Sequence, residues 1–180
     1  MGIVVPQTLI RLTFLLVLFI SQTATADCFL DASKRYGVNH SLLLAIAKVE
    51  SNYNPEALNP DSHALGVMQI MPTNFAALKK YNIQESHLHD PCINIHVGAW
   101  ILAGFMRQYG PVWRAVGGYG VGNGRTPAHE RARVIYADKV QRALCKIEGC
   151  NSSRAVSHAK PPEKQIPAAV TSASNMLVVE

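Results

Sequence analysis

The sequence predicts an all-α domain, and three features of the chain support that expectation. Residues 42–49 are apolar on nearly every side, as is typical of a helix inside a domain. Serine, threonine, aspartate and proline recur where helices begin, and glycine recurs where they end. Alternating apolar and polar residues, typical of strands, are almost absent. We therefore expect helices with at most a minor extended segment, near residues 67–70.

The helix signals follow one another in chain order. The expected helices lie at residues 28–36, from 41 through the apolar run, 72–81, 91–109, from 111, and from 127. Ser41 can cap the second of them, and the pair Asp90-Pro91 begins the longest. We expect this longest helix, which contains Trp100, to pack against the apolar helix of residues 42–49.

Residues 1–26 have the pattern of an export signal. Arg11 supplies a positive charge, residues 12–20 an apolar core, and the Ala-Thr-Ala sequence at 24–26 a cleavage site. The apolar run is shorter than the roughly 20 residues that span a bilayer. We therefore predict a periplasmic or secreted protein that is not embedded in the membrane after signal removal. A lipoprotein signal is the alternative because Cys28 is so close, but Asp27 stands where such signals have a small residue.

After this signal the chain divides into a domain and a tail. Residues 27–150 are long enough for one globular domain with its own core. Residues 151–180 contain Pro161, Pro162 and Pro167, with many alanines and serines and few large apolar residues. Such a segment buries too little surface to offset the entropy of ordering it, so we predict a flexible tail. Its end, residues 176–179, is either a docking peptide or a frayed terminus.

Four cysteines predict two disulfides in an oxidising compartment, with three possible connectivities. Cys145 and Cys150 are close enough in sequence to close a small loop, which favours Cys28–Cys92 as the other bridge. A zinc site is the competing interpretation, and it lacks the C-x-x-C spacing.

The charge of the chain gives a weaker indication. There are 17 basic and 12 acidic residues, a net charge of +5 that becomes +4 once Arg11 is removed. A basic exported protein suits an anionic polymer such as the cell wall. No nucleic-acid-binding motif is present, and export argues against a nucleic-acid partner.

Glu50 is the first candidate functional residue. It follows the apolar run one turn after Ile46 and two turns after Leu43, so its carboxylate projects from an apolar stripe. Removing a carboxylate from water is costly. Glu50 is therefore either turned to solvent and paired with a cation, or a carboxyl whose pKa is raised for general-acid catalysis.

Three further motifs follow. They are Gly-Val-Met-Gln-Ile-Met-Pro at 66–72, Ala-Val-Gly-Gly-Tyr-Gly-Val-Gly at 115–122 and Arg-Val-Ile-Tyr-Ala at 133–137. Together with Glu50-Ser51 they resemble the lytic transglycosylases of the goose-lysozyme-like superfamily. Tyr119 and Gly122 match the Ala-Tyr-Asn-x-Gly segment of that family, whereas Gly120 replaces its usual asparagine, which is associated with substrate contact.

The resemblance covers about residues 28–145 and implies a single lysozyme-like domain. Residues 88–105 are especially similar to small specialised members of the family. Those members open channels in the wall for secretion machines, conjugation apparatus or pili. The implied partners are peptidoglycan glycan strands and components of such a machine.

The resemblance also implies a mechanism with one carboxyl group. In this family the glutamate protonates the leaving oxygen, the N-acetyl group of the muramyl sugar is thought to assist, and the glutamate then acts as base while the 6-hydroxyl attacks. No second acid accompanies the motifs in this chain, because Glu56 and Asp61 lie in a polar loop and Asp90 caps a helix.

The same resemblance assigns substrate-binding roles to Ser51, Met68, Gln69, Tyr119 and Tyr136. Ser51 would orient the acid or the sugar, Gln69 would hold the N-acetyl group or the acid's surroundings, and Met68 would pack at the cleft floor. Tyr119 would hydrogen-bond the glutamate, and Tyr136 would line the cleft. The structural alternatives are that Ser51 ends a helix and that the two tyrosines fill core space.

No cofactor or metal is expected. His87, His89, Asp90 and Cys92 are closely spaced, but the implied mechanism needs no metal and a disulfide would use Cys92. Two other functions stay open. One is a lysozyme-type hydrolase that uses water in place of the 6-hydroxyl. The other is a catalytically weak wall-binding assembly module, which Gly120 alone supports.

Overall fold

The computed structural model describes residues 28–150, which form helices joined by loops. Residues 28–36 are helical. The long helices that follow are α2 (His40–Ser51), α4 (Pro91–Tyr109), α5 (Trp113–Val121) and α6 (Pro127–Glu148). The short elements between α2 and α4 are η1 (Pro72–Asn74), α3 (Phe75–Leu78), η2 (Lys79–Tyr81) and η3 (Glu85–His89). The predicted all-α fold is confirmed.

Extended structure in the described residues is limited to two isolated bridges, Leu58 with Leu65 and Leu65 with Ile70. Residues 66–69 form a turn between the bridged positions, so the extended segment expected at 67–70 is a turn that one bridge closes. The export signal expected at 1–26 and the tail expected at 151–180 lie outside the described residues. Within the described part of the chain, no helix is both long and apolar enough to cross a membrane.

Side chains fix where the helices begin, and one cap differs from the expectation. Asn39, not Ser41, caps α2, because its Oδ1 accepts a hydrogen bond from the Leu42 backbone N–H at 2.9 Å. Asp90 caps α4 as expected and accepts from the Ile93 backbone N–H at 2.9 Å. Thr126 caps α6.

The lengths of two helices also correct the sequence analysis. Among residues 28–150 the longest helix is α6 with 22 residues, whereas α4 has 19. No glycine interrupts α6 before Gly149, whose φ of 72° ends the helix. Helix α5 begins at Trp113 and not at Pro111, because Val112 is extended, with φ −126° and ψ 163°.

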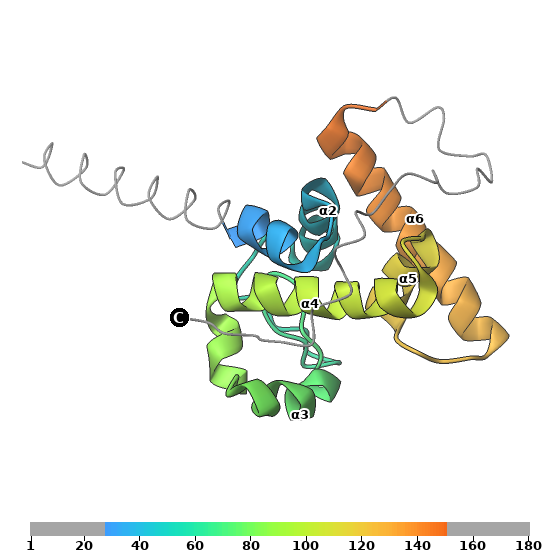
Figure 1. Ribbon diagram of the computed structural model, residues 1–180. Coiled ribbons are helices and arrows are strands. Elements are labelled where there is room, and N and C mark those ends of the chain that lie inside the picture. The colour runs from blue at the N-terminus through green and yellow to red at the C-terminus, as the bar shows by residue number, and fades with distance from the viewer. Residues whose placement is uncertain (1–27, 151–180) are drawn as a thin grey trace, which may run out of the picture.

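Helix α6 packs along both α5 and α2, and α4 crosses the molecule below α2 in Figure 1, packing on α5. The expectation that α4 packs against α2 is therefore wrong, because the helix that packs extensively on α2 is α6. Met68, in the loop after α2, lies directly against α4, because Gly98 has no side chain at the point of contact. A Cβ at Gly98 would lie 2.7 Å from the Met68 Cβ.

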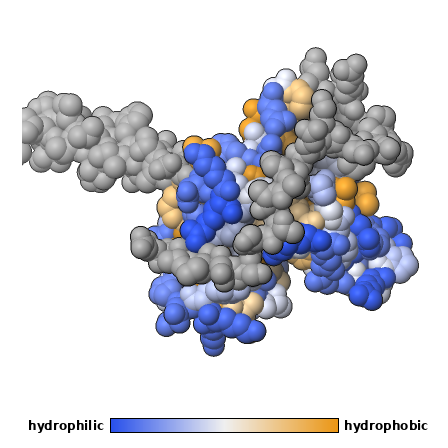
Figure 2. All heavy atoms as spheres, viewed as in Figure 1, coloured by the Kyte–Doolittle hydropathy of each residue, from blue (hydrophilic) through white to orange (hydrophobic). Residues whose placement is uncertain are grey.

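Apolar side chains from all the long helices fill one core, including Leu43 and Ile46 of α2, Val97 and Leu102 of α4, and Val140 of α6. The face drawn in Figure 2 is mainly hydrophilic, with hydrophobic side chains in small patches. This distribution is what a folded domain with a shared apolar interior requires. Trp100 is only partly buried and packs edge-on against Tyr81, with ring centroids 5.9 Å apart.

The favoured disulfide pairing is confirmed. Cys28–Cys92 joins the first helix to the start of α4, with the Cα atoms 5.3 Å apart. Cys145–Cys150 closes the small loop at the end of α6, with the Cα atoms 4.9 Å apart. With Cys92 in a disulfide and Asp90 capping α4, two of the four residues that suggested a metal have structural roles.

Candidate active site

Glu50 lies in the last turn of α2 and is partly buried. Desolvation raises the pKa of its carboxyl above the ordinary value of 4.5, and this is the largest influence on the group. Two nearby groups lower the pKa to a smaller extent: the Tyr136 hydroxyl, by a hydrogen bond, and the Lys139 ammonium, by its charge. The net effect is the raised pKa that a general acid needs.

The tyrosine that contacts Glu50 is Tyr136 and not Tyr119. Tyr136 lies on α6, which packs on α2, and its Oη donates a hydrogen bond to Glu50 Oε1. Tyr119 Oη instead donates to the backbone oxygen of Met68 at 2.7 Å. The expected Tyr119–Glu50 hydrogen bond is therefore wrong, because α5 directs Tyr119 to the loop of residues 66–72. Burial and the Glu50 charge raise the pKa of both tyrosines well above the ordinary value, so both stay protonated donors.

Ser51 joins the end of α2 to the motif at residues 66–72. Its Oγ donates a hydrogen bond to the Val67 backbone oxygen at 2.8 Å. This contact fixes the loop of residues 66–72 next to Glu50, although the two segments are separated by 16 residues in sequence.

Met68 and Gln69 have different surroundings in that loop. Met68 is fully buried under the site, against Gly98 of α4. Gln69 is partly exposed and has a φ of 50°. Its Nε2 donates to the backbone oxygens of Ala57 and Gly66, at 3.1 and 3.0 Å. The amide nitrogen thus stabilises the loop. The Oε1 atom of Gln69 is left to accept a hydrogen bond from a sugar.

Asn94 is a structural residue of the site that the sequence analysis missed. It is fully buried on α4. Its Oδ1 accepts from the Met68 N–H at 2.8 Å, and its Nδ2 donates to the oxygens of Leu65 and Leu88, both at 2.9 Å. The available signal was an amide within the apolar register of a helix, because a buried amide must find partners.

Arg133 begins the motif at 133–137, where the sequence analysis assigned it no role, and it organises the end of the motif at 115–122. It is almost fully buried on α6, and its guanidinium donates to the backbone oxygens of Gly122 and Gly124. Nη1 also pairs with Glu130 at 2.5 Å. A buried arginine with these partners holds the chain after α5 against α6.

Gly120 has a steric role in the site. A Cβ at this position would lie 2.5 Å from Tyr136 Cγ and closer still to two other atoms of the ring. The Tyr136 ring therefore occupies the space where a larger residue at position 120 would begin. Gly120, which stands where the resembled family has asparagine, therefore leaves room for the Tyr136 ring beside Glu50.

No second carboxylate joins Glu50 within the described residues. The groups that shift its pKa are a tyrosine and a lysine. Glu56 and Asp61 are exposed in the loop after α2, and Asp90 is exposed at its capping position. A helical domain with one partly buried glutamate and one phenolic donor to its carboxyl fits a glycan-cleaving class of enzyme that works with a single carboxyl.

Comparison with known proteins agrees with this class. Residues 27–140 match the Transglycosylase SLT domain family. Invasion protein IagB of Salmonella typhimurium is 42% identical over 134 residues, 72% of this chain and 82% of that protein. Protein IpgF of Shigella flexneri is 36% identical over 141 residues, 76% of this chain and 91% of that protein. The chain belongs to the transglycosylase SLT family and is a peptidoglycan lytic transglycosylase.

Two solved structures show the same fold. The 70 kDa soluble lytic transglycosylase of Escherichia coli superposes with a TM-score of 0.57 at 24% identity over 69% of this chain. An inactive mutant of lytic transglycosylase Slt from Pseudomonas aeruginosa gives a TM-score of 0.56 at 22% identity, also over 69% of this chain. The aligned part is about a quarter of each of those proteins, 24% of their length.

Proposed function

We propose that the enzyme cleaves the β-1,4 bond between N-acetylmuramic acid and N-acetylglucosamine and leaves a 1,6-anhydro-muramyl end. The observation that carries this proposal is the environment of Glu50: desolvation raises its pKa, and no other carboxyl in the described residues shifts it. A site with one carboxyl has neither the nucleophile of a retaining glycosidase nor the separate base of an inverting one.

In the first step the Glu50 proton passes to the leaving O4 of the glucosamine residue. The bond from the muramyl C1 to that oxygen breaks, and the carbonyl oxygen of the muramyl N-acetyl group stabilises the positive charge that forms at C1. Glu50 becomes a carboxylate, which the Tyr136 hydroxyl and the Lys139 charge favour. Tyr136 and Lys139 thus stabilise the Glu50 carboxylate, which the first step creates.

In the second step the Glu50 carboxylate accepts the proton of the muramyl 6-hydroxyl, and that oxygen bonds to C1. The N-acetyl carbonyl is released, Glu50 regains its proton, and no water is consumed. Tyr136 would position the carboxyl in both steps. We assign substrate contacts to Gln69 and the rim of the loop of residues 66–72, with Ser51, Met68 and Tyr119 holding that loop beneath the sugar.

Digestion of purified peptidoglycan followed by mass spectrometry tests the reaction. The expected muropeptides end in 1,6-anhydro-muramic acid and are lighter by one water than hydrolase products. The Glu50→Gln protein serves as control and should release neither. Reducing-end products alone would establish a lysozyme-type hydrolase, and unchanged cleavage by Glu50→Gln would remove Glu50 from the mechanism.

We also propose that the enzyme is exported by residues 1–26 and opens the wall locally for a secretion, conjugation or pilus apparatus. The similarity to an invasion protein of Salmonella typhimurium supports a link to such a system. The test is to delete the gene and restore it as wild type or Glu50→Gln. Apparatus assembly should return only with the wild type, whereas equal rescue by both would contradict the proposal.

A further inference from the structure

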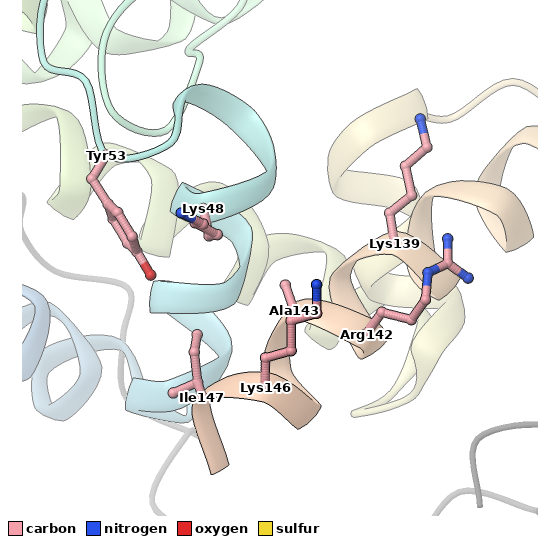
Figure 3. Close-up of a pocket in the computed structure, with 7 residues that line it drawn as sticks. All are labelled: Lys48, Tyr53, Lys139, Arg142, Ala143, Lys146 and Ile147. Carbon is pink, nitrogen blue, oxygen red and sulfur yellow. The ribbon is translucent and has the colours of Figure 1, made fainter. Parts of the chain in front are cut away.

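A pocket of about 430 Å³ lies between the end of α2 and the C-terminal half of α6, next to the candidate active site. In Figure 3, Lys48 comes from α2 and Tyr53 from the chain just after it, while Lys139, Arg142 and Lys146 come from α6. The contact between the two helices that positions Tyr136 beside Glu50 therefore also shapes this pocket.

Charge is the distinctive property of the pocket. Four of its lining side chains are cations and none is acidic. On α6, Lys139, Arg142 and Lys146 stand at i, i+3 and i+7, which places them on one face. Among residues 28–150, none of these cations takes part in an ion pair. Because no acidic group of the described residues neutralises these four cations, they produce a positive electrostatic potential in the pocket, which favours binding of an anion.

The pocket adjoins the reacting groups. Lys139, which lines the pocket, stands one turn after Tyr136 on α6. The charge of Lys139 acts on Glu50 and lowers the pKa of its carboxyl. An anionic group in the pocket would therefore lie near the bond that Glu50 cleaves, and it would offset the effect of Lys139 on the acid.

Apolar surface lies among the cations. Ala143 and Ile147 of α6 and the ring of Tyr53 complete the lining. This mixture suits a short peptide with methyl groups and carboxylates better than a bare inorganic anion. In peptidoglycan such peptides are attached through the lactyl groups of the muramyl residues, and most of the carboxylates of the polymer are found there.

We propose that this pocket binds the stem peptide of a muramyl residue at the cleavage site. Carboxylates of the peptide meet Lys139, Arg142 and Lys146, and its alanyl methyl groups meet Ala143 and Ile147. The inference rests on the proposed cleavage at Glu50, and it names the part of the substrate that is recognised beside that bond.

The test compares two substrates: glycan strands with intact stem peptides, and the same strands after an amidase has removed the peptides. The pocket variant is Arg142→Gln with Lys146→Gln, both exposed and neither in contact with Glu50. The matched control, Lys79→Gln with Lys80→Gln, removes the same charge from η2, which directly follows α3 in sequence. In Figure 1, α3 lies on the opposite side of α4 from α2. Thermal melting should show both variants folded.

We expect the pocket variant to lose about tenfold or more in kcat/KM on the peptide-bearing strands, the effect of one or two charge-assisted contacts. On the stripped strands it should match the wild type, and the control should match the wild type on both. An equal loss on both substrates, an equal loss in the control, or no loss would overturn the proposal. Wild-type protein that makes no 1,6-anhydro ends from either substrate would instead refute the proposed cleavage.

A binding measurement identifies the source of the anion. Calorimetry with the full-length Glu50→Gln protein should detect the free stem peptide, and the added Arg142→Gln and Lys146→Gln changes should abolish the signal. Inorganic phosphate should bind at least about tenfold more weakly than the peptide, because it cannot use the apolar lining. Phosphate binding as strong as peptide binding would overturn the assignment to a stem peptide.

Discussion

Tyr136 Oη donates a hydrogen bond to Glu50 Oε1, joining two helices whose residues are 86 positions apart in sequence. The donor stabilises the carboxylate, whereas desolvation favours the protonated carboxyl. The two effects oppose each other, and desolvation is the larger. Glu50 is therefore a carboxyl with a raised pKa that can still give up and regain a proton.

Tyr136→Phe should lower kcat and move the pH profile. Removing the donor raises the pKa of Glu50 further, because the carboxylate loses a stabilising hydrogen bond. Activity that requires protonated Glu50 is lost as pH rises through this pKa, so the alkaline limb should move to higher pH. We expect kcat to fall by about 10–100-fold, which corresponds to about 1.4–2.7 kcal/mol of lost positioning and stabilisation. An unchanged limb in the kcat/KM profile would show that Tyr136 does not act on Glu50.

Gly120→Ala should reduce activity through Tyr136. The added Cβ would overlap the Tyr136 ring, which must move and weaken its hydrogen bond to Glu50. We expect a loss of activity similar to that of Tyr136→Phe and a stability cost of about 1–3 kcal/mol. The double mutant Gly120→Ala/Tyr136→Phe should be little worse in kcat than either single mutant, because both remove one interaction. Fully additive losses would contradict this coupling.

Glu50→Gln should increase the stability of the fold at neutral pH while activity falls by about 10²–10⁴-fold. The folded-state pKa of Glu50 lies above its unfolded value, so the folded protein binds the extra proton between the two values. Wild-type stability from this group is therefore full below pH 4.5 and is lost as pH rises through the folded pKa. Denaturant melts at pH 4 and pH 7 should show the gain from Glu50→Gln at pH 7 only. A larger gain at pH 4 would contradict the raised pKa.

Asn94→Ala should destabilise the domain without removing any residue that contacts Glu50. Three backbone groups, the Met68 N–H and the oxygens of Leu65 and Leu88, lose their partner inside the protein. We expect a cost of about 2–4 kcal/mol in the free energy of unfolding, because unsatisfied buried polar groups are expensive. Asn74→Ala, which removes an exposed amide contact to the Met71 oxygen, is the matched control and should cost less than about 0.5 kcal/mol. Equal melting curves for the two variants would show that Asn94 is not needed to hold the loop.

The local features of this protein could be predicted from the sequence. The apolar run before Glu50, the Asp90-Pro91 and Thr126-Pro127 starts and the spacing of the cysteines are signals read within a few residues. They gave the helical class, most helix positions, both disulfides and the candidate acid with its raised pKa. Burial of an apolar stripe and capping of a helix end depend on nearby residues, which is why such patterns predict them.

Only the tertiary structure decided how side chains from distant segments meet. The packing of α6 on α2 brings Tyr136 to Glu50, and α5 directs Tyr119 to the Met68 oxygen instead. Asn94 anchors the loop of residues 66–72 from a helix that the motifs do not include. Contacts of this kind depend on helix rotation and on sterically permitted approach, as at Gly120 beneath the Tyr136 ring, and residue spacing along the chain does not specify either.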